Sequence, residues 1–413
     1  MKCIKKIFRG LAGAAAVASL GILTVVGLVN REIPTRFQVT NGKDFQLESP
    51  GISVSTSFSN ELTAAASLPA GNGYQAKVML FNAIPVKTVD VSVVRETLVI
   101  PCGTPFGIKM FTNGVMVVGV SDIQSDGAIV NPASKAGLKV GDIIVSVNGE
   151  EMNQNEQVAA AIEKSLGKPV SVTVKRDNVL LDTVLEPVKS DVDSSYKGGL
   201  WVRDSTAGIG TVTFYNPTNS AFAGLGHGIC DIDTAEIMPL GSGDIVPVTI
   251  SGVVKGEKGK AGELRGYFSS DVPVGSLEAN VEAGVYGTLN SAPVNREALK
   301  VAMKQEVKTG PAKVLTTIDG GEPRYYDIQI ESVNYKNHAM SKNLVICVTD
   351  PDLLAKTGGI VQGMSGSPII QDGMLVGAVT HVFVNDPTKG YGIFAENMMS
   401  VSQSVCMQSA LAS

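Results

Sequence analysis

The chain has 413 residues, of which 45 are glycine and 5% are aromatic, and its formal net charge at pH 7 is −5. This length leaves room for two or three domains, and the abundance of glycine favours many turns and short strands. The negative net charge provides no basic surface, so nucleic acid is not an expected partner. The five cysteines lack the paired spacing of a zinc site, and we expect neither a metal nor another cofactor.

Residues 1–30 are expected to form a cytoplasmic tip and a transmembrane anchor. Four basic residues within the first nine positions precede an uncharged, mostly apolar run, 10–29. A run of this length can cross a bilayer as a helix, and its basic flank belongs in the cytoplasm. A cleaved signal peptide is the alternative, but no clean cleavage box follows the run, which favours the anchor. The bulk of the chain would then lie outside the cytoplasm.

Residues 31–97 are expected to contain a linker and N-terminal strands. The stretch 62–73 consists mostly of small residues and is typical of a flexible linker, whereas the apolar residues of 76–94 predict strands. Exposed linkers of small residues are sites where proteolysis concentrates.

Residues 98–190 contain the segment 131–149, which reads NPASKAGLKVGDIIVSVNG. Gly137 is suited to end a short helical turn, and the Asn-Gly pair at the end of the segment is a hairpin signal. The apolar residues of 154–166 recur at helical spacing, which predicts a helix. The segment resembles the bacterial PDZ signature, which implies a PDZ domain whose groove, between a strand edge and that helix, binds an extended peptide.

Phe106, Gly107 and Ile108 resemble the carboxylate-binding loop of PDZ domains, and we predict that they bind the peptide. An ordinary turn before the apolar run 115–118 is an equally good interpretation of these three residues.

In residues 191–413, short apolar runs alternate with glycine-rich turns, which predicts an all-β sandwich or barrel. Residues 361–368 of this region read VQGMSGSP. The glycines allow a tight turn around Ser365, in which the backbone N–H groups of Gly363 and Ser365 can point to one spot, as an oxyanion hole requires. Ser365 is therefore a candidate nucleophile, with Ser367 as its nearest rival. A simple glycine- and serine-rich loop between strands is the alternative.

A serine nucleophile needs a base, and the chain has three histidines. His227 lies between two glycines, which favours an accessible base, although an ordinary glycine-rich turn would look the same. His338 lies in a polar stretch that is typical of a solvent-facing turn. His381 follows an apolar strand and is expected to line the cleft without taking part in the chemistry.

The segment GMSGSP, 363–368, resembles the Gly-Asp-Ser-Gly-Gly-Pro box of trypsin-like peptidases, from which Met364 and Ser367 depart. Together with GHG at 226–228 and GAVTHV at 377–382, it resembles the SpoIVB peptidases, the stage IV sporulation protein B family. This resemblance runs from the N-terminal apolar run through the PDZ module to near the end of the chain.

The resemblance implies a mainly β protein in which a trypsin-like double β-barrel, residues 191–413, follows the PDZ domain. It makes Ser365 the nucleophile and His227 the base, and it places Thr380 and His381 on the substrate-binding strand. Trypsin-like enzymes that prefer Lys or Arg carry an acid six positions before the serine. Gly359 stands there, so that preference is not expected.

The same resemblance makes Asp350 the third member of a catalytic triad, the acid that orients the base. Asp350 precedes Pro351 and is equally suited to cap a short helix, and the two roles are compatible. In trypsin-like enzymes the acid lies far upstream of the serine, so Asp231, Asp233 and Asp271 stay open as alternatives.

The resemblance further implies a membrane-anchored serine endopeptidase that processes itself, in the linker 62–73, and makes a signalling cleavage during sporulation. It would act in the intermembrane space between mother cell and forespore. Its substrate would be a protein that regulates a membrane metalloprotease, so that a late sigma factor is processed.

Two other functions fit parts of the sequence. A degradative protease of the HtrA type would carry its PDZ domain after the protease domain, which is the opposite of the order expected here. A membrane-anchored PDZ module with a catalytically inactive β domain would bind peptides without cutting them.

Overall fold

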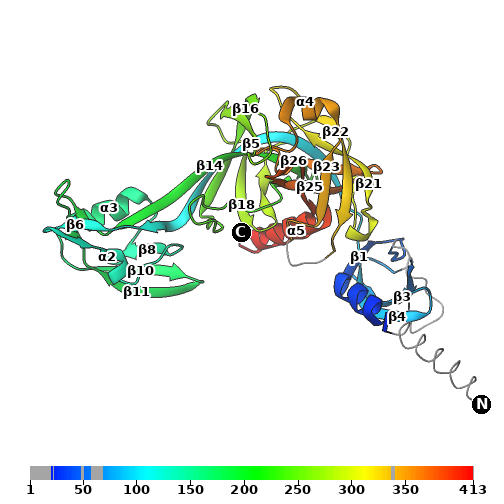
Figure 1. Ribbon diagram of the computed structural model, residues 1–413, viewed down its shortest axis with the longest axis horizontal. Helices are drawn as coiled ribbons and strands as arrows, with labels where there is room; N and C mark the ends of the chain where they lie inside the picture. The colour runs from blue at the N-terminus through cyan, green and yellow to red at the C-terminus, as the bar shows by residue number, and fades with distance from the viewer. Residues whose placement is uncertain (1–19, 22, 48–50, 57–67, 336–339, 413) are drawn as a thin grey trace, which may run out of the picture.

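The computed structural model describes residues 20–21, 23–47, 51–56, 68–335 and 340–412. Figure 1 shows an elongated chain with a PDZ module at one end, a small N-terminal sheet at the other and a body of strands between them. Strands dominate, which confirms the predicted mainly β class. No helix within these ranges is long and apolar enough to cross a membrane, and the predicted span 10–29 lies mostly outside them.

The N-terminal part is a four-stranded sheet with the strand order β1-β4-β3-β2. Its strands are β1 (Arg36–Thr40), β2 (Ile52–Thr56), β3 (Gly73–Leu80) and β4 (Ile84–Val94). Ala76 and Val78 of β3 and Val89 and Val91 of β4 are buried at alternate positions, as in a half-buried sheet, so the strands predicted in 76–94 are confirmed. Residues 62–67 of the predicted linker lie outside the described residues.

Among the described strands, six close into a first barrel, because each pairs antiparallel with the next and the last pairs with the first. In ring order they are β5 (Leu98–Val120), β14 (Leu200–Tyr215), β15 (Ala221–Gly224), β19 (Gly284–Leu289), β18 (Gly275–Val281) and β16 (Ser242–Val254). The barrel is filled by a core that includes Phe106, Phe222 and Ile245. A further strand, β17 (Glu263–Phe268), extends the sheet beyond the barrel by pairing with β16.

Six more of the described strands close a second antiparallel barrel in the same way. In ring order they are β21 (Gly310–Thr316), β22 (Arg324–Val333), β23 (Leu344–Val348), β26 (Asp386–Phe394), β25 (Met374–Phe383) and β24 (Pro368–Gln371). This ring confirms the predicted double β-barrel.

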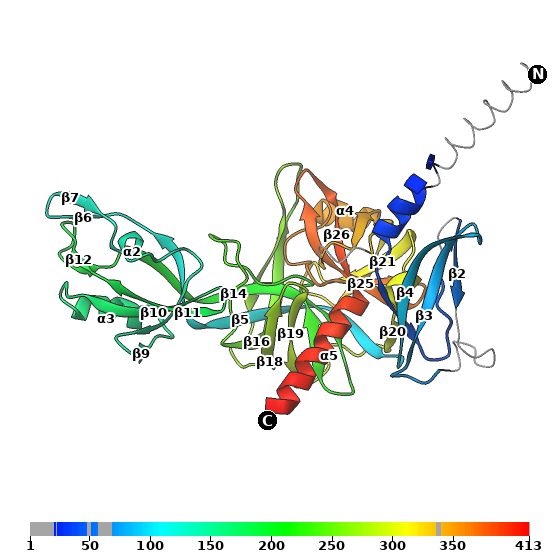
Figure 2. The ribbon, with the colours of Figure 1, turned by 90° about the horizontal axis from the view of Figure 1, so that it is seen from below.

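Two elements join the barrels. The short strand β20 (Leu299–Val301) pairs with β5 of the first barrel and β25 of the second. The C-terminal helix α5 (Ala395–Ala412) contacts strands of both barrels, and Figure 2 shows it lying along them. A shared core that includes Phe214, Tyr286 and Met398 fills the space between these elements. The two barrels therefore form one body.

The PDZ module has its own core, which includes Val117, Ile144, Val158 and Ile162. Its described elements are β6 (Ile123–Ser125), β7 (Ala128–Val130), α2 (Pro132–Lys135), β8 (Ile143–Val147), β9 (Glu150–Glu151), α3 (Asn155–Lys164), β10 (Val170–Arg176) and β11 (Val179–Leu185). The predicted helix in 154–166 is thus present as α3. A groove of about 820 Å³ lies beside α3 and β6, and it includes the first residues of β14. This is the place where a PDZ domain takes up a peptide.

The PDZ module is inserted into the first barrel rather than placed before it. The long strand β5 enters the module and β14 returns from it, and the two pair from Val120 and Leu200 down to Ile100 and Tyr215. The predicted domain start at residue 98 therefore falls at the beginning of a barrel strand.

The prediction that Phe106, Gly107 and Ile108 form the carboxylate-binding loop is wrong. These residues lie in the middle of β5, where they pair with β14 on one side and β16 on the other. The side chains of Phe106 and Ile108 are only 3% and 2% exposed in the barrel core, because a barrel strand turns its apolar residues inward.

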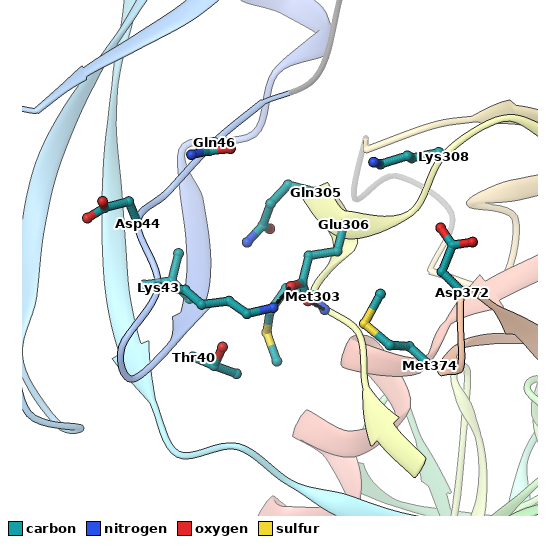
Figure 3. Close-up of a pocket in the computed structure, with 11 residues that line it drawn as sticks. Thr40, Lys43, Asp44, Gln46, Met303, Gln305, Glu306, Lys308, Asp372 and Met374 are labelled. Atoms are coloured by element: carbon teal, nitrogen blue, oxygen red, sulfur yellow. Dashed lines mark hydrogen bonds and ion pairs between the residues drawn. The ribbon is translucent and has the colours of Figure 1, made fainter. Parts of the chain in front are cut away.

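The N-terminal sheet contacts the second barrel across a pocket of about 330 Å³, shown in Figure 3. Lys43 Nζ lies 2.7 Å from Glu306 Oε1. Gln305 Nε2 donates a hydrogen bond of 2.6 Å to the backbone oxygen of Gln38. These polar contacts hold the sheet beside the short 3-10 turn Lys304–Glu306.

The insertion predicts how truncated chains behave. A fragment that starts at residue 191 lacks β5, which leaves edges of β14, β16 and β20 without a partner and opens the core of the first barrel. We expect this fragment not to unfold cooperatively when it is heated and followed by circular dichroism, because an open barrel exposes apolar surface and unpaired backbone groups.

The matched control removes the PDZ module and keeps β5. Met116 of β5 is paired with Arg203 of β14. Replacing residues 117–202 by Asn-Gly therefore joins the two strands through a two-residue hairpin turn. We expect this chain to unfold cooperatively. Cooperative unfolding of the 191–413 fragment would contradict the conclusion that β5 is needed to close the first barrel.

Candidate active site

Ser365 lies in the loop that leads from α4 (Pro351–Thr357) into β24 of the second barrel. The glycine after it, Gly366, has a φ of +95°, and a Cβ atom there would collide with the backbone oxygen of Thr211. Only glycine fits this turn, because it accepts a positive φ and lets two backbones approach. Ser367, the rival nucleophile, is 0% exposed, and its hydroxyl bonds to Thr316 inside the barrel. Ser365 is therefore the serine of the loop that is open to a substrate.

Strand β14 of the first barrel holds three backbone oxygens of this loop. Thr211 Oγ1 donates to Gly363 O at 2.8 Å, Thr211 N donates to Ser365 O at 3.1 Å, and Thr213 Oγ1 donates to Gly366 O at 2.7 Å. The carbonyls consequently face the first barrel. The N–H groups of Gly363 and Ser365 have no acceptor among the described residues, and both residues line the cleft. They are free to hold an oxyanion there, as the sequence predicts.

His227 is presented by the loop after β15. Gly226 has a φ of +69°, and a Cβ atom there would lie 2.9 Å from Thr380 Cγ2, so glycine brings this loop close to β25. Asn280 of β18 fastens the far side of the loop, since its side-chain amide donates to the backbone oxygens of Ile229 and Met238, both at 2.9 Å. Its amide oxygen accepts from Ile229 N at 2.7 Å.

The hydrogen bond of the His227 ring defines its tautomer. Nδ1 lies 2.9 Å from the backbone oxygen of Gly228, so Nδ1 carries the hydrogen and Nε2 has the free lone pair of a base. Burial lowers the pKa of His227 below its usual value, and the Gly228 carbonyl offsets part of this effect. The ring is therefore neutral and ready to accept a proton near pH 7.

Ser365 and His227 line the same cleft, which has a volume of about 540 Å³ and draws its walls from both barrels. In the described state the Ser365 hydroxyl donates to the backbone oxygen of Thr380 at 2.7 Å. The Ser365 O–H must give up this acceptor before it can donate to His227.

His381 also lines the cleft, beside Thr380, as the resemblance implies. Its ring centroid lies 4.9 Å from that of His227, and the ring planes are inclined by 37°. The third histidine, His338, lies outside the described residues.

Asp350 is the N-cap of α4. Its Oδ1 accepts hydrogen bonds from the backbone N–H groups of Asp352 and Leu353, and its Oδ2 accepts from Asp327 N. Asp350 is not among the residues that line the cleft, and it has no contact with His227. The capping role is therefore confirmed, and no contact supports the role of triad acid.

The three alternative acids also form ion pairs with basic side chains. Asp231 is buried and pairs with Arg203, which also binds Asp233 at 2.8 Å. Asp271 is exposed and pairs with Lys109 at 2.6 Å. Within the described ranges, no carboxylate is hydrogen-bonded to the His227 ring.

The rest of the cleft is uncharged. Apart from the two histidines, its lining contains no acidic or basic side chain, and it includes Ile108, Ile209, Leu225, Ile229, Ile360, Val361 and Val382. In the part of the chain that the structure describes, no group of three His, Cys, Asp or Glu side chains is placed to hold a metal ion. The functional groups in this cleft are hydroxyls, two imidazoles, the thiol of Cys230 and backbone N–H groups. A hydroxyl, an imidazole and backbone N–H groups are what acyl transfer requires.

The sequence gives no signal for several residues that position the site. Thr211 and Thr213 look like ordinary β-branched residues of a strand, and Asn280 stands alone within β18. Each acts on a loop that is distant along the chain. Their role becomes visible only when the strand partners are known.

Comparison with known families matches residues 194–399 to the SpoIVB peptidase S55 family and residues 131–176 to a PDZ domain family. The Regulator of sigma-W protease RasP of Bacillus subtilis is 42% identical over 55 residues, 13% of each protein. The Regulator of sigma-E protease RseP of Salmonella typhimurium is 32% identical over 79 residues, 19% of this chain and 17% of that protein. The chain thus spans less than a fifth of the length of these relatives.

Among solved structures, the HtrA-type protease AlgW with a decapeptide has a TM-score of 0.31 and 11% sequence identity, covering 50% of this chain and 55% of that one. The double barrel, the cleft and the two family matches define a PDZ-containing serine endopeptidase. The chain belongs to the SpoIVB peptidase family. Its PDZ domain is a peptide-binding module.

Replacing Asp350 by Asn separates capping from catalysis. The amide keeps an oxygen for the two N–H groups of the cap and loses the bond from Asp327, so we expect a loss of about 1 kcal/mol in unfolding free energy. We expect a fluorophosphonate to label Ser365 within about tenfold of the wild-type rate, whereas amidation of a triad acid costs about 10⁴-fold. A loss of that size would restore Asp350 as the triad acid.

The lowered pKa of His227 predicts the pH dependence of the enzyme. A general base works in its deprotonated form, and a pKa below 6.5 extends that form to more acidic solutions. The rate at which a fluorophosphonate labels Ser365 should rise with pH through a midpoint below 6.5 and level off above it. A midpoint at or above 6.5 would contradict a buried, neutral His227 as the base.

Proposed function

We propose that the cleft between the barrels is the active site, with Ser365 as nucleophile and His227 as base. One observation carries the proposal: the serine and the histidine line one cleft, beside two backbone N–H groups that have no protein acceptor among the described residues. Nucleophile, base and oxyanion donors are the three parts that acyl transfer requires.

The reaction is the hydrolysis of a peptide bond. Ser365 Oγ leaves the Thr380 carbonyl and attacks the substrate carbonyl carbon while its proton passes to Nε2 of His227. The N–H groups of Gly363 and Ser365 hold the resulting oxyanion. His227 then gives the proton to the leaving amine as the C–N bond breaks, and a water molecule hydrolyses the acyl-enzyme by the same steps.

The lining of the cleft supports a preference for substrates with apolar side chains. Burying a Lys or Arg side chain beside residues such as Ile360 and Val361 would cost free energy, since no acid in the lining could pair with it. Gly359 at the sixth position before the serine agrees with this preference. Thr380 and His381 belong to the strand along which the substrate backbone would lie.

Family membership also supports a proposal for the biological role. We propose a membrane-anchored enzyme that cuts itself in the linker 62–73 and makes a signalling cleavage during sporulation, between mother cell and forespore. Its substrate would be a protein that regulates a membrane metalloprotease upstream of sigma factor processing. Membership in the SpoIVB family supports this role, and the partial similarity to the proteins named Regulator of sigma-W protease RasP and Regulator of sigma-E protease RseP is consistent with it.

An active-site probe tests the assignment. In the full-length chain we expect a fluorophosphonate to label the wild type, and both Ser365→Ala and His227→Ala to lower turnover of an apolar peptide by about 10⁴-fold or more. Mass spectrometry of the chain's own N-termini should show the shortened forms only in chains that are labelled. A panel of peptides should be cut faster after apolar residues than after Lys or Arg.

The matched control is Ser367→Ala, which alters a buried serine two positions away and should leave labelling intact. Labelling of Ser365→Ala at the wild-type rate, or unchanged turnover in His227→Ala, would end the proposal. The remaining function would be that of an inactive, anchored PDZ module.

A further inference from the structure

The loop that presents His227 contains a buried carboxylate that takes no part in the proposed proton transfer. Asp231 follows His227 by four positions, and its side chain is 0% exposed. Its Oδ1 accepts hydrogen bonds from the backbone N–H groups of Asp233 at 3.0 Å and Thr234 at 2.9 Å. Its own backbone N–H donates to the oxygen of Glu236 at 2.9 Å. Asp231 therefore fixes the tight turn at the tip of this loop.

A guanidinium from the first barrel balances the charge of this carboxylate. Nη1 of Arg203 donates to Oδ2 of Asp231, and Nη2 donates to Oδ2 of Asp233 at 2.8 Å. No other basic side chain of the described residues forms an ion pair with Asp231. A buried charge that loses its partner strongly destabilises the structure around it. The position of the loop tip therefore depends on Arg203.

Arg203 is supplied by the end of β14 that belongs to the PDZ module. The three residues before it, 200–202, line the groove beside α3. The residue after it, Asp204, accepts a hydrogen bond of 2.9 Å from the backbone N–H of Asn155, the first residue of α3. Residues 200–204 thus join the wall of the PDZ groove and the PDZ helix to the loop that presents His227.

The tip of the same loop also touches the PDZ module directly. Gly141 lies in the turn before β8 with a φ of +90°, and a Cβ atom there would lie 2.5 Å from Oε2 of Glu236. Residues 231–236 are therefore in contact with both β14 and the PDZ module, but none of them lines the catalytic cleft. The tip can influence catalysis only through the backbone that connects it to His227.

We propose that Arg203 and Asp231 are positioning residues, whose ion pair holds the loop where His227 can take the proton of Ser365 and makes this placement depend on the PDZ module. This inference rests on the proposed function of Ser365 and His227. Neither side chain of the pair lines the cleft, so both act through the three residues that separate His227 from Asp231. A displacement of about 1 Å in a catalytic group costs about 100-fold in rate.

The test replaces Arg203 by Met in the full-length chain, which keeps an apolar stem and removes both contacts with the loop. We expect fluorophosphonate labelling of Ser365 to fall about 100-fold. It should fall about tenfold in Arg203→Lys, whose single ammonium cannot reproduce the two contacts of a guanidinium. In turnover of an apolar peptide, kcat should fall while KM changes less than about twofold, because Arg203 does not line the cleft.

The pH dependence of labelling is a readout that a general loss of stability would not move. Burial is the main cause that lowers the pKa of His227, so a released loop admits water and this pKa rises toward 6.5. The pH midpoint of labelling should therefore move up in Arg203→Met. His381 and Cys230, the other titratable side chains of the cleft lining, are unchanged in this variant, as is Lys342, which helps to lower the pKa of His381.

The matched control is Lys109→Met, which removes another ion pair of the first barrel. Lys109 Nζ lies 2.6 Å from Asp271, and the side chains of Lys109 and Arg203 are each 30% exposed. We expect this control to be labelled at the wild-type rate.

A double variant, Arg203→Met with Asp231→Asn, tests whether the two residues act as a pair. The Asn keeps an oxygen for the two N–H groups of the turn and removes the unpaired buried charge. We expect this chain to be labelled at least about tenfold faster than Arg203→Met alone.

The outcomes separate the two proposals. Wild-type labelling in Arg203→Met, with no labelling in His227→Ala, would overturn the positioning role and leave the proposed function intact. A loss in Arg203→Met with an unchanged pH midpoint and no recovery in the double variant would indicate general destabilisation and would also overturn it. If Arg203→Met does not unfold cooperatively, Arg203→Lys decides, and a wild-type rate there would count against the pair. Absence of labelling at Ser365 in the wild type would remove the proposed function and this inference together.

Discussion

The hydrogen bonds from β14 to the nucleophile loop are the contacts on which the site depends. Thr211 and Thr213, in the first barrel, hold three carbonyl oxygens of a loop that belongs to the second barrel. The N–H groups of Gly363 and Ser365 belong to the neighbouring peptide units, have no acceptor among the described residues, and are the groups proposed to hold the oxyanion. This loop is therefore held by both barrels, since Gly366 N and Ser365 Oγ also donate to the backbone oxygens of Val379 and Thr380 in β25.

Strand β14 also links the site to the PDZ module. Its first residues, 200–202, line the groove beside α3, and residues 206–209 of the same strand line the catalytic cleft. Between them, Arg203 pairs with Asp231 in the loop that presents His227. The PDZ domain is thus joined to the peptidase by two continuous, paired strands, which transmit position more rigidly than a flexible linker does.

Much of the site could be read from the sequence, because turns around a nucleophile are encoded by adjacent residues. Ser365 and His227 were recognisable from the glycines beside them, and both line the cleft. The loop predicted at Phe106 was wrong because Phe-Gly-Ile fits a PDZ loop and a barrel strand equally well. The role of Asp350 was ambiguous for a similar reason, since an aspartate before proline can be the N-cap of a helix or the acid of a catalytic triad.

The sequence by itself determined the mainly β class, the PDZ helix α3, and the serine and histidine of the cleft. The class and the helix depend on periodicity and turn chemistry within a few residues, whereas the serine and histidine were chosen from the glycines beside them together with the resemblance to the SpoIVB peptidases. Only the tertiary structure decided that β5 closes the first barrel across the PDZ insertion, and that His381 rather than an aspartate lies against His227. Such contacts join residues 80 to 154 positions apart along the chain, and their register is set by the closure of the barrels, which no local pattern contains.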